Sequence, residues 1–250
     1  MTIYKKILEA KVLGKKLLTM LIDPDTKDLE NIYKTIDKAI SAHVDCFFIG
    51  GSLLHQNSLA EIVDYIKSKT HIPVILFPGN TAQVYSQADA TLFPSVISGR
   101  NPELLIGRHV ESAGLLRESG IEVISLGYML IDSGLTTTVN YITNTSPIPY
   151  DNTNIAISTA IAGELLGMKM IYLEAGSGAP RTISSKMINQ VSKNINVPLI
   201  VGGGIKTPEQ AEEILDAGAD MIVVGNALET NDDLIFDLSA TVHSIKTKTV

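Results

Sequence analysis

The chain has 250 residues, of which 45% are hydrophobic and 19% are charged, and its net charge is −7. This length predicts one large domain or two small ones. The balance of 20 basic against 27 acidic side chains argues against a broad nucleic-acid-binding surface, which needs a basic footprint. Cys46 is the single cysteine and is expected to be a buried thiol, and no apolar run approaches the ~18–20 residues that span a bilayer. Because Lys11, Lys15 and Lys16 interrupt any apolar signal segment, we expect a soluble cytoplasmic protein.

Short apolar runs alternate with longer segments of helical periodicity. The runs are rich in Val, Ile, Leu and Phe and do not alternate strictly with polar residues, which is typical of strands covered on both faces. Eight runs fit this description: 17–22, 44–49, 74–77, 91–93, 122–126, 170–173, 199–201 and 221–224.

The intervening segments carry apolar stripes that predict helices packed against a sheet. Clear stripes are Ile32, Ile36, Ala39 and Ile40; Leu59, Ile62, Val63 and Ile66; Ile183, Met187, Ile188, Val191 and Ile195; and Leu234, Ile235, Leu238, Val242 and Ile245. Two helix starts have capping-box patterns, Ser58-x-x-Glu61 and Thr207-Pro208-x-Gln210, the second with proline at the first helical position.

Eight strand–helix units predict a single (β/α)₈ TIM barrel domain over residues 1–250, with a doubly wound open sheet as the alternative. Two features depart from a regular barrel. Only about a dozen residues separate the third and fourth strands, so the third crossover helix is short or missing. The polar segment 131–151 after the fifth strand is long, and a structureless loop of that length is usually a lid or a binding loop.

Glycine-rich segments follow five of the predicted strands, at their carboxyl ends. They are Gly50-Gly51-Ser52, Pro78-Gly79-Asn80, Ala175-Gly176-Ser177-Gly178, Gly202-Gly203-Gly204 and Gly225-Asn226. In a barrel enzyme this end carries the active site, and the loops after strands seven and eight commonly bind phosphate. Glycine lets the backbone approach a ligand, and a following helix start adds free N–H groups. A single pair of glycines is explained by a tight turn, but the last three segments together predict a phosphate site.

Carboxylates end two of the predicted strands. Asp23 and Asp25 follow the first strand, and Glu174 ends the sixth. Oxygen donors of this kind suit Mg²⁺, which takes one or two carboxylates and completes its shell with water and substrate phosphates. Ser52, at the neighbouring strand end, offers a hydroxyl to the same ion. For Asp25 a cap on the following turn is an equal alternative.

The remaining reactive side chains give weaker signals. The five histidines lack metal-ligand spacing, so we do not expect zinc, and His109 is read as a helix-surface or core residue. Arg100, just after the fourth strand, is a candidate for binding a second anionic group, with an exposed structural role as the alternative. Nothing in the sequence pairs Cys46 with a base, which argues against a cysteine nucleophile.

Six segments occur in register with those of a known family. They are Leu-Ile-Asp-Pro-Asp (21–25), Phe-Ile-Gly-Gly-Ser (48–52), Phe-Pro-Ser-Val (93–96), Tyr-Leu-Glu-Ala-Gly-Ser-Gly (172–178), Val-Gly-Gly-Gly-Ile (201–205) and Val-Val-Gly-Asn-Ala (223–227). Over nearly the whole chain the sequence resembles the geranylgeranylglyceryl phosphate synthase family, which includes the bacterial heptaprenylglyceryl phosphate synthases. The segment 172–178 is the most specific part of the resemblance.

The resemblance implies a Mg²⁺-dependent prenyltransferase of ether-lipid synthesis. Such enzymes join the 3-hydroxyl of sn-glycerol 1-phosphate to a prenyl diphosphate, here geranylgeranyl diphosphate, and release pyrophosphate. It further implies a homo-oligomer with at most peripheral membrane contact. The implied Mg²⁺ ligands are Asp23 and Ser52, and Glu174 is the expected catalytic base. The implied substrate-binding residues are Tyr172, Leu173, Glu174, Ala175, Gly176, Ser177, Gly178, Gly203, Gly204, Gly225 and Asn226.

One position departs from the family pattern. Some members have a phosphate-contacting lysine two residues before the strand-one aspartate, where this chain has Leu21. The form of segment 21–25 and the long loop after the fifth strand look more like the second branch of the family, in which geranylgeranyl donors are typical. A heptaprenyl or other donor, a barrel enzyme acting on a sugar or indole phosphate, and a non-catalytic phosphometabolite binder are the alternatives. Candidates for an apolar prenyl groove are Phe93, Tyr128, Met129 and Tyr141, although core packing is the preferred explanation for most of them.

Overall fold

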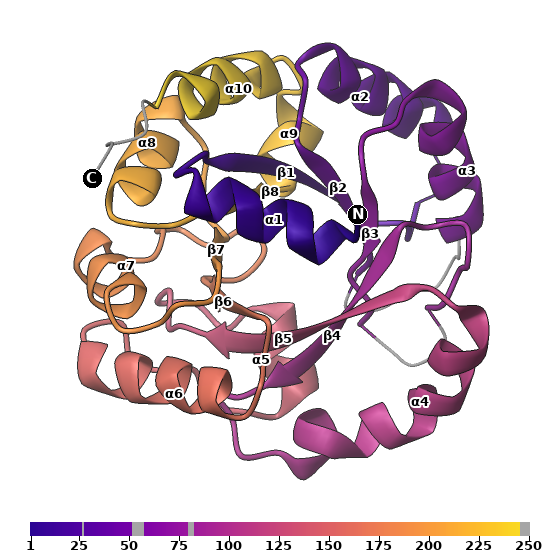
Figure 1. Ribbon diagram of the computed structural model, residues 1–250. Coiled ribbons are helices and arrows are strands. Elements are labelled where there is room, and N and C mark those ends of the chain that lie inside the picture. Colours follow the sequence, from indigo (N-terminus) through magenta and orange to yellow (C-terminus); the bar gives the residue numbers. More distant parts are fainter. Residues whose placement is uncertain (27, 52–57, 80–82, 246–250) are drawn as a thin grey trace.

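Eight parallel strands close into a barrel in which each strand pairs with the next and β8 pairs with β1. The structure, a computed structural model, describes residues 1–26, 28–51, 58–79 and 83–245. The predicted (β/α)₈ barrel is therefore confirmed and the open sheet is excluded (Figure 1). The strands are β1 Leu17–Ile22, β2 Cys46–Ile49, β3 Val74–Leu76, β4 Ala90–Val96, β5 Glu122–Leu130, β6 Met170–Glu174, β7 Leu199–Gly202 and β8 Met221–Val224.

Helices surround the barrel on the outside (Figure 1). At the predicted capping box of Thr207 the N-cap bond forms, since its hydroxyl accepts the N–H of Gln210, whereas Gln210 Oε1 accepts the N–H of Lys206 instead of that of Thr207. At the other predicted box, Ser58 makes no side-chain cap. The helices are α1 Ile3–Val12, α2 Leu29–Ser41, α3 Leu59–Lys69, η1 Glu103–Gly107 (a π-helical turn), α4 Arg108–Ser119, α5 Thr138–Thr143, α6 Thr153–Leu165, α7 Ser185–Ser192, α8 Pro208–Asp216, α9 Asn226–Thr230 and α10 Leu234–Ser244.

Successive side chains along each strand divide between two apolar layers, because neighbouring residues of a strand point to opposite faces. In β6, Tyr172 packs inside the barrel, whereas Ile171 and Leu173 pack outward against the helices. All three are fully buried. This double burial explains why the strands appear in the sequence as continuous apolar runs.

Helix α1 lies across the amino-terminal end of the barrel (Figure 1). The Glu122 carboxylate accepts the N–H groups of Ile3 and Tyr4 at 2.5 and 3.1 Å, and the buried side chains of Ile3 and Ile7 join the interior layer. Acceptance of free helix N–H groups by a carboxylate stabilises a helix start. The short stripe of α1 is interrupted by Lys5, Lys6 and other charged residues, so periodicity did not predict this helix.

Of the two predicted irregularities, the described residues agree with the first and differ from the second. Among the described residues between β3 and β4 there is no helix. The connection 131–151 after β5 is partly ordered, contrary to the expectation of a structureless loop: it contains α5 and a parallel bridge between Ile131 and Ile148. In the part of the chain that the structure describes, no helix is long and apolar enough to cross a membrane.

Candidate active site

The carboxyl ends of the strands bring most of the predicted residues to one mouth. The register places Glu174 beside Gly202 and Gly202 beside Val223, and β8 closes the barrel against β1, which Asp23 follows. A pocket of about 370 Å³ opens there and is lined by residues from both halves of the chain, including Leu21, Gly50, Gly51, Glu174 and Ser177. Ser52 lies outside the described residues.

Glu174 places a buried carboxylate at this mouth. Its side chain is 8% exposed, and Oε1 accepts the backbone N–H of Gly176 at 2.6 Å. Burial raises the pKa of the Glu174 carboxyl above its ordinary value, because desolvation penalises the charged form. The nearby Tyr172 hydroxyl and the Gly176 N–H act in the opposite direction. A carboxyl with a raised pKa at a pocket wall is suited to accept a proton near neutral pH.

Tyr172 contributes a buried hydroxyl that makes no hydrogen bond to any other residue that the structure describes. Burial raises the pKa of this phenol well above its ordinary value, and the Glu174 charge adds to that effect. The ring packs beside Phe77 and Tyr128, with centroid separations of 5.7 and 5.5 Å. A buried hydroxyl without a partner is costly, so its position beside Glu174 marks it as a group that a ligand would satisfy.

Two glycine segments form the floor next to Glu174. Gly203 has φ +85° and Gly176 has φ +100°, a region that side-chain-bearing residues rarely adopt. A Cβ atom at Gly203 would lie 2.5 Å from Glu174 Oε1 and 2.8 Å from the Gly176 nitrogen. The backbones of the β6 and β7 loops can therefore approach each other, and a ligand, only because these positions lack side chains.

The other predicted substrate-binding residues differ in whether their side chains lie at the mouth or pack against the helices. Ser177 and Asn226 are exposed at the mouth and are joined by a hydrogen bond between their side chains, which links the β6 loop to the start of α9 beside Gly225. The side chains of Leu173 and Ala175 pack in the outer layer against the helices. Only the backbone of these two residues can therefore face the mouth.

Asp23 follows β1 at the mouth, and its chemistry fits a divalent cation. Oδ1 accepts the N–H of Asp25 at 3.0 Å, and the carboxylate packs so closely on Gly51 that a Cβ atom there would clash with it. Although Asp23 keeps an exposed surface, desolvation raises the pKa of its carboxyl. The Asp25 N–H opposes this shift and the Asp25 charge adds to it. An anion in this environment gains from a bound cation. The described residues contain no cluster of three or more His, Cys, Asp or Glu side chains, so a metal here would complete its shell from water and substrate.

Away from Glu174 the pocket is mainly apolar. It runs between β3, β4 and α4, and Phe93, Leu104 and Tyr128 are among its lining residues. Two of the four candidates for an apolar groove, Phe93 and Tyr128, line this pocket. Met129 packs in the outer layer instead, and Tyr141 is 83% exposed, so neither lines the pocket. Helix α5 supplies a further wall through Val139 and Ile142.

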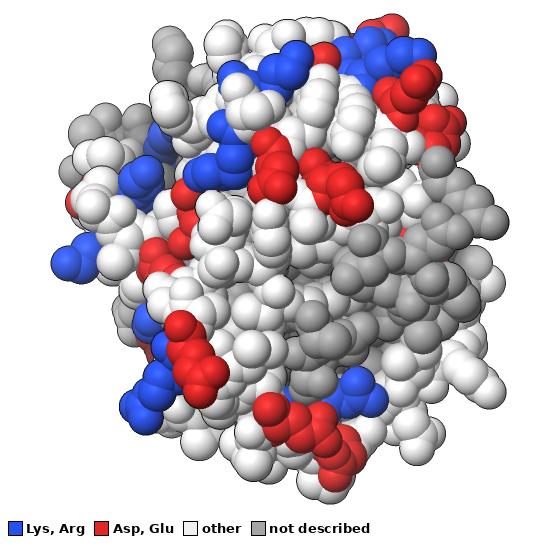
Figure 2. Space-filling model, turned by 90° about the vertical axis from the view of Figure 1, so that its right-hand side faces the viewer, with Lys and Arg blue, Asp and Glu red and all other residues white. Residues whose placement is uncertain are grey.

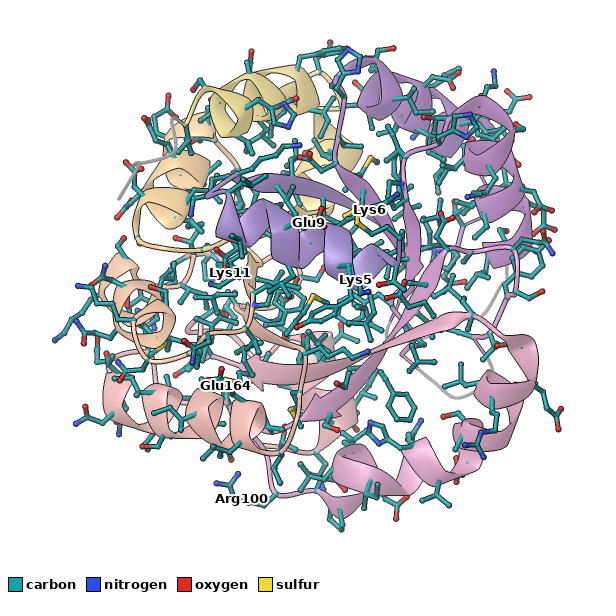
Figure 3. The ribbon with its side chains drawn as sticks, viewed as in Figure 1. Lys5, Lys6, Glu9, Lys11, Arg100 and Glu164 are labelled. Carbon is teal, nitrogen blue, oxygen red and sulfur yellow. The ribbon has the colours of Figure 1, made fainter. Side chains whose placement is uncertain are left out.

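The other two candidates, Arg100 and His109, make contacts that are typical of structural residues. Arg100 donates to the carbonyl oxygens of Ile97 and Gly99, and it projects outward at the periphery of the barrel (Figure 3). It does not line the pocket. His109 is buried, as expected of a core histidine, and its Nε2 pairs with the Ser95 hydroxyl at 3.1 Å. It nevertheless borders the pocket.

Sequence reasoning missed two polar residues near the mouth. Gln83 is buried; its amide accepts the N–H of Gly79 at 3.0 Å and donates to the Gly51 carbonyl at 3.3 Å, which joins the loops after β2 and β3. Arg181 lies in the β6 loop, and its guanidinium stacks on the Tyr150 ring. Neither belongs to a motif, so no spacing signal marks them.

Comparison with known proteins agrees with this geometry. The family model described as the PcrB family matches residues 10–243. A geranylgeranylglyceryl phosphate synthase of Chitinophaga pinensis is 50% identical to this chain, over 97% of this chain and 96% of its own length.

Two solved structures are similar over the whole barrel. Wild-type GGGPS from Thermoplasma volcanium has a TM-score of 0.91 and 36% identity, with 99% of this chain and 100% of that chain covered. The (S)-3-O-geranylgeranylglyceryl phosphate synthase from Thermoplasma acidophilum, solved in complex with its substrate sn-glycerol-1-phosphate, has a TM-score of 0.91 and 33% identity, with 98% and 100% covered. By its matched length, its identity to these relatives and its barrel, the chain belongs to the PcrB family and is a prenyltransferase of the geranylgeranylglyceryl phosphate synthase type.

Proposed function

We propose that this mouth joins the 3-hydroxyl of sn-glycerol 1-phosphate to geranylgeranyl diphosphate and releases pyrophosphate. One observation carries the proposal. The buried Glu174 carboxylate lies between glycine loops suited to phosphate on one side and an apolar pocket of about 370 Å³ on the other. A proton acceptor at the junction of a polar and an apolar site is what transfer between a phosphorylated alcohol and a prenyl donor requires.

Glycerol phosphate would be held by the β6, β7 and β8 loops. Gly176, Gly203 and Gly204 have backbones that a phosphate can approach, and Ser177 and Asn226 add side-chain polar groups at the same rim. The chain is acidic overall, and among the described residues on the face shown in Figure 2 blue and red side chains lie next to one another without a broad basic area. The substrate anions must therefore be neutralised by local donors and a cation rather than by the field of the whole protein.

The prenyl tail would occupy the apolar part of the pocket. Its volume lies within the usual range for small-molecule sites, and its lining includes Phe77, Phe93, Leu104 and Val139. Burial of an apolar chain there is favourable in proportion to the area removed from water.

Asp23 and Ser52 are the proposed Mg²⁺ ligands, on the resemblance of the sequence and, for Asp23, on its desolvated carboxylate at the mouth. When bound, the ion would supply positive charge to the diphosphate, which stabilises the leaving group.

Glu174 is the proposed general base. Its Oε1 is fixed by the Gly176 N–H, which leaves the carboxylate oriented toward the mouth to accept the proton of the 3-hydroxyl. The alcohol oxygen forms its bond to the allylic carbon while the bond from that carbon to the diphosphate oxygen breaks. The electron pair of the broken bond leaves with pyrophosphate. The Tyr172 hydroxyl would orient the glycerol from beside Glu174.

Turnover by the purified protein tests the proposal. With Mg²⁺, sn-glycerol 1-phosphate and a mixture of prenyl diphosphates, mass spectrometry should identify a geranylgeranyl ether of glycerol phosphate as the main product. Glu174→Gln should lower kcat by roughly 10²–10⁴-fold, the usual contribution of general-base catalysis, while circular dichroism stays unchanged. A heptaprenyl product would show that the donor is heptaprenyl diphosphate instead. Binding of glycerol phosphate without any product would favour a non-catalytic binder.

We also propose that residues 1–250 act as one cytoplasmic domain in a homo-oligomer with at most peripheral membrane contact. The closed barrel and the exposed apolar side chains of Val110, Leu165 and Leu166 support this proposal. Light scattering coupled to gel filtration tests the subunit number, and a monomeric mass would contradict it.

A further inference from the structure

The connection between β5 and α6, residues 131–151, forms one wall of the apolar pocket. Its helix α5 lines the pocket through Thr138, Val139, Ile142 and Thr143. The carboxyl end of α5 is held by Asn101, whose side-chain amide donates to the Thr143 carbonyl at 2.9 Å, while Tyr141 projects into solvent. Other contacts hold the base of the connection, where its two ends meet.

The two ends of the connection lie side by side. Ile131 bridges to Ile148, and Asp132 donates its N–H to the Ile148 carbonyl at 2.8 Å. This pairing closes residues 131–148 into a loop with a narrow base, from which α5 extends toward the pocket.

A single side chain from the neighbouring glycine loop touches both ends of that base. The Arg181 guanidinium lies 3.6 Å from the centroid of the Tyr150 ring, at the outgoing end. Its Nη2 donates to the carbonyl of Asp132, at the incoming end, at 3.4 Å. Arg181 belongs to the β6 loop, and its own backbone carbonyl packs against Gly204. The base of the α5 loop is thus attached to the two segments proposed to hold glycerol phosphate.

A second contact supports the same attachment. Thr137, the residue before α5, packs on Gly176 so closely that a Cβ atom at Gly176 would clash with it. The wall of the apolar pocket and the proposed phosphate loop are therefore in direct contact at two separate points, Thr137 with Gly176 and the loop base with Arg181.

We propose that Arg181 is a positioning residue that holds the α5 wall of the prenyl pocket against the glycerol phosphate loop. The role rests on the proposed function, because it assigns the apolar pocket to the prenyl donor. Arg181 acts through Tyr150 and Asp132, so its loss should loosen the site of one substrate while the glycine loops that bind the other stay in place.

One variant of Arg181 and two variants of Tyr150 test the contact. Arg181→Gln and Tyr150→Leu should each raise the KM for geranylgeranyl diphosphate by roughly fivefold, which corresponds to about 1 kcal/mol for an exposed cation–π pair, with little change in the KM for glycerol phosphate. Tyr150→Phe keeps the ring and should behave as wild type. Arg117→Gln, at an exposed arginine on α4, is the matched control. The double variant Arg181→Gln/Tyr150→Leu should lose no more than Arg181→Gln alone, because the arginine variant already removes the contact with Tyr150.

Amide hydrogen exchange measures the effect of the same contact on α5 and does not require turnover. In Arg181→Gln and Tyr150→Leu the amides of residues 138–143 should exchange faster than in wild type, while those of β6 and β7 should not change. If wild type makes no ether product, the proposed function fails, and exchange still decides whether Arg181 holds the wall. Unchanged exchange together with unchanged KM for the prenyl donor overturns the proposal. A rise in the KM for glycerol phosphate alone also overturns it, since that result marks direct contact of Arg181 with the phosphate.

Discussion

The carboxylate of Glu174 occupies the space that a side chain at Gly203 would need. A Cβ atom there would meet Oε1 at 2.5 Å and the backbone of Gly176 at 2.8 Å, and the backbone at Gly203 has a positive φ of +85°. The β7 loop therefore depends on this glycine for both its conformation and its fit to the proposed base.

Gly203→Ala tests this relationship. The substitution strains the backbone and displaces Glu174, so we expect the free energy of unfolding to fall by about 1–3 kcal/mol and turnover to be largely lost. Chemical unfolding and steady-state kinetics measure the two effects. Gly114→Ala in α4 is the control: a Cβ atom there meets nothing within 4 Å, and replacing a helical glycine by alanine should stabilise the protein by roughly 0.5–1 kcal/mol. Equal effects of the two substitutions would contradict the packing argument.

Glu174 should also make the stability of the protein depend on pH. Its folded-state pKa is raised by burial, so between the ordinary carboxyl pKa and this raised value the folded state keeps a proton that the unfolded state loses. The contribution of Glu174 to stability is therefore most favourable at low pH and declines as pH rises through that interval.

Glu174→Gln removes this titration. The free energy of unfolding of the variant minus that of wild type should increase as pH rises through the interval and then level off. Burying the uncharged amide of the variant has a free-energy cost that does not depend on pH, so it does not affect this trend. Urea unfolding in the presence of EDTA at a series of pH values measures the difference. Parallel pH profiles of the free energy of unfolding for the two proteins would show that the pKa of Glu174 is not shifted by folding.

Tyr172→Phe should separate binding from stability. Among the described residues the Tyr172 hydroxyl has no hydrogen-bond partner, so its removal should relieve a desolvation cost and raise the free energy of unfolding by about 1–3 kcal/mol. If glycerol phosphate satisfies this hydroxyl, its KM should rise roughly tenfold, the value of one hydrogen bond of ordinary strength. A marked loss of stability with unchanged KM would assign the hydroxyl a structural role instead.

Metal removal tests Asp23. We expect EDTA to abolish turnover and Mg²⁺ to restore it, and Asp23→Asn to raise the Mg²⁺ concentration needed for half-maximal rate by tenfold or more (roughly the loss of one charged ligand). Asp28→Asn provides a control, because Asp28 is an aspartate that caps α2. Equal Mg²⁺ requirements in the Asp23 variant and wild type would exclude Asp23 as a ligand.

The sequence predicts the barrel well because its strands are buried on both faces. Apolar runs such as 17–22 and 221–224 match β1 and β8 residue for residue. The fifth run was expected to stop at 126, yet β5 continues to Leu130. Gly127, which looks like a strand end, is instead a place of close packing, because a Cβ atom there would meet the side chains of Ile171, Ile97 and Met168. Such a glycine cannot be told from a turn glycine by sequence alone.

The site is predicted less completely than the fold. Strand-end position makes Asp23 and Glu174 candidates, and the barrel brings the strands that precede or carry them to one mouth. The alternation within β5 and β6, which turns Met129 and Leu173 away from the mouth, depends on a register that an apolar run does not reveal. Gln83 and Arg181 act through loops that meet only in the folded chain, so no spacing in the sequence relates them to their partners.

The amino-terminal end of the barrel, which helix α1 closes, is a suitable place to attach a label or a support. Cys46 is the only cysteine, and burial raises the pKa of its thiol to about 12, so it is a poor target for alkylating reagents. A cysteine introduced in place of the exposed Lys6, on α1 (Figure 3), would be the thiol that reacts. A fluorophore or a solid support attached there leaves the opposite end of the barrel open to solution.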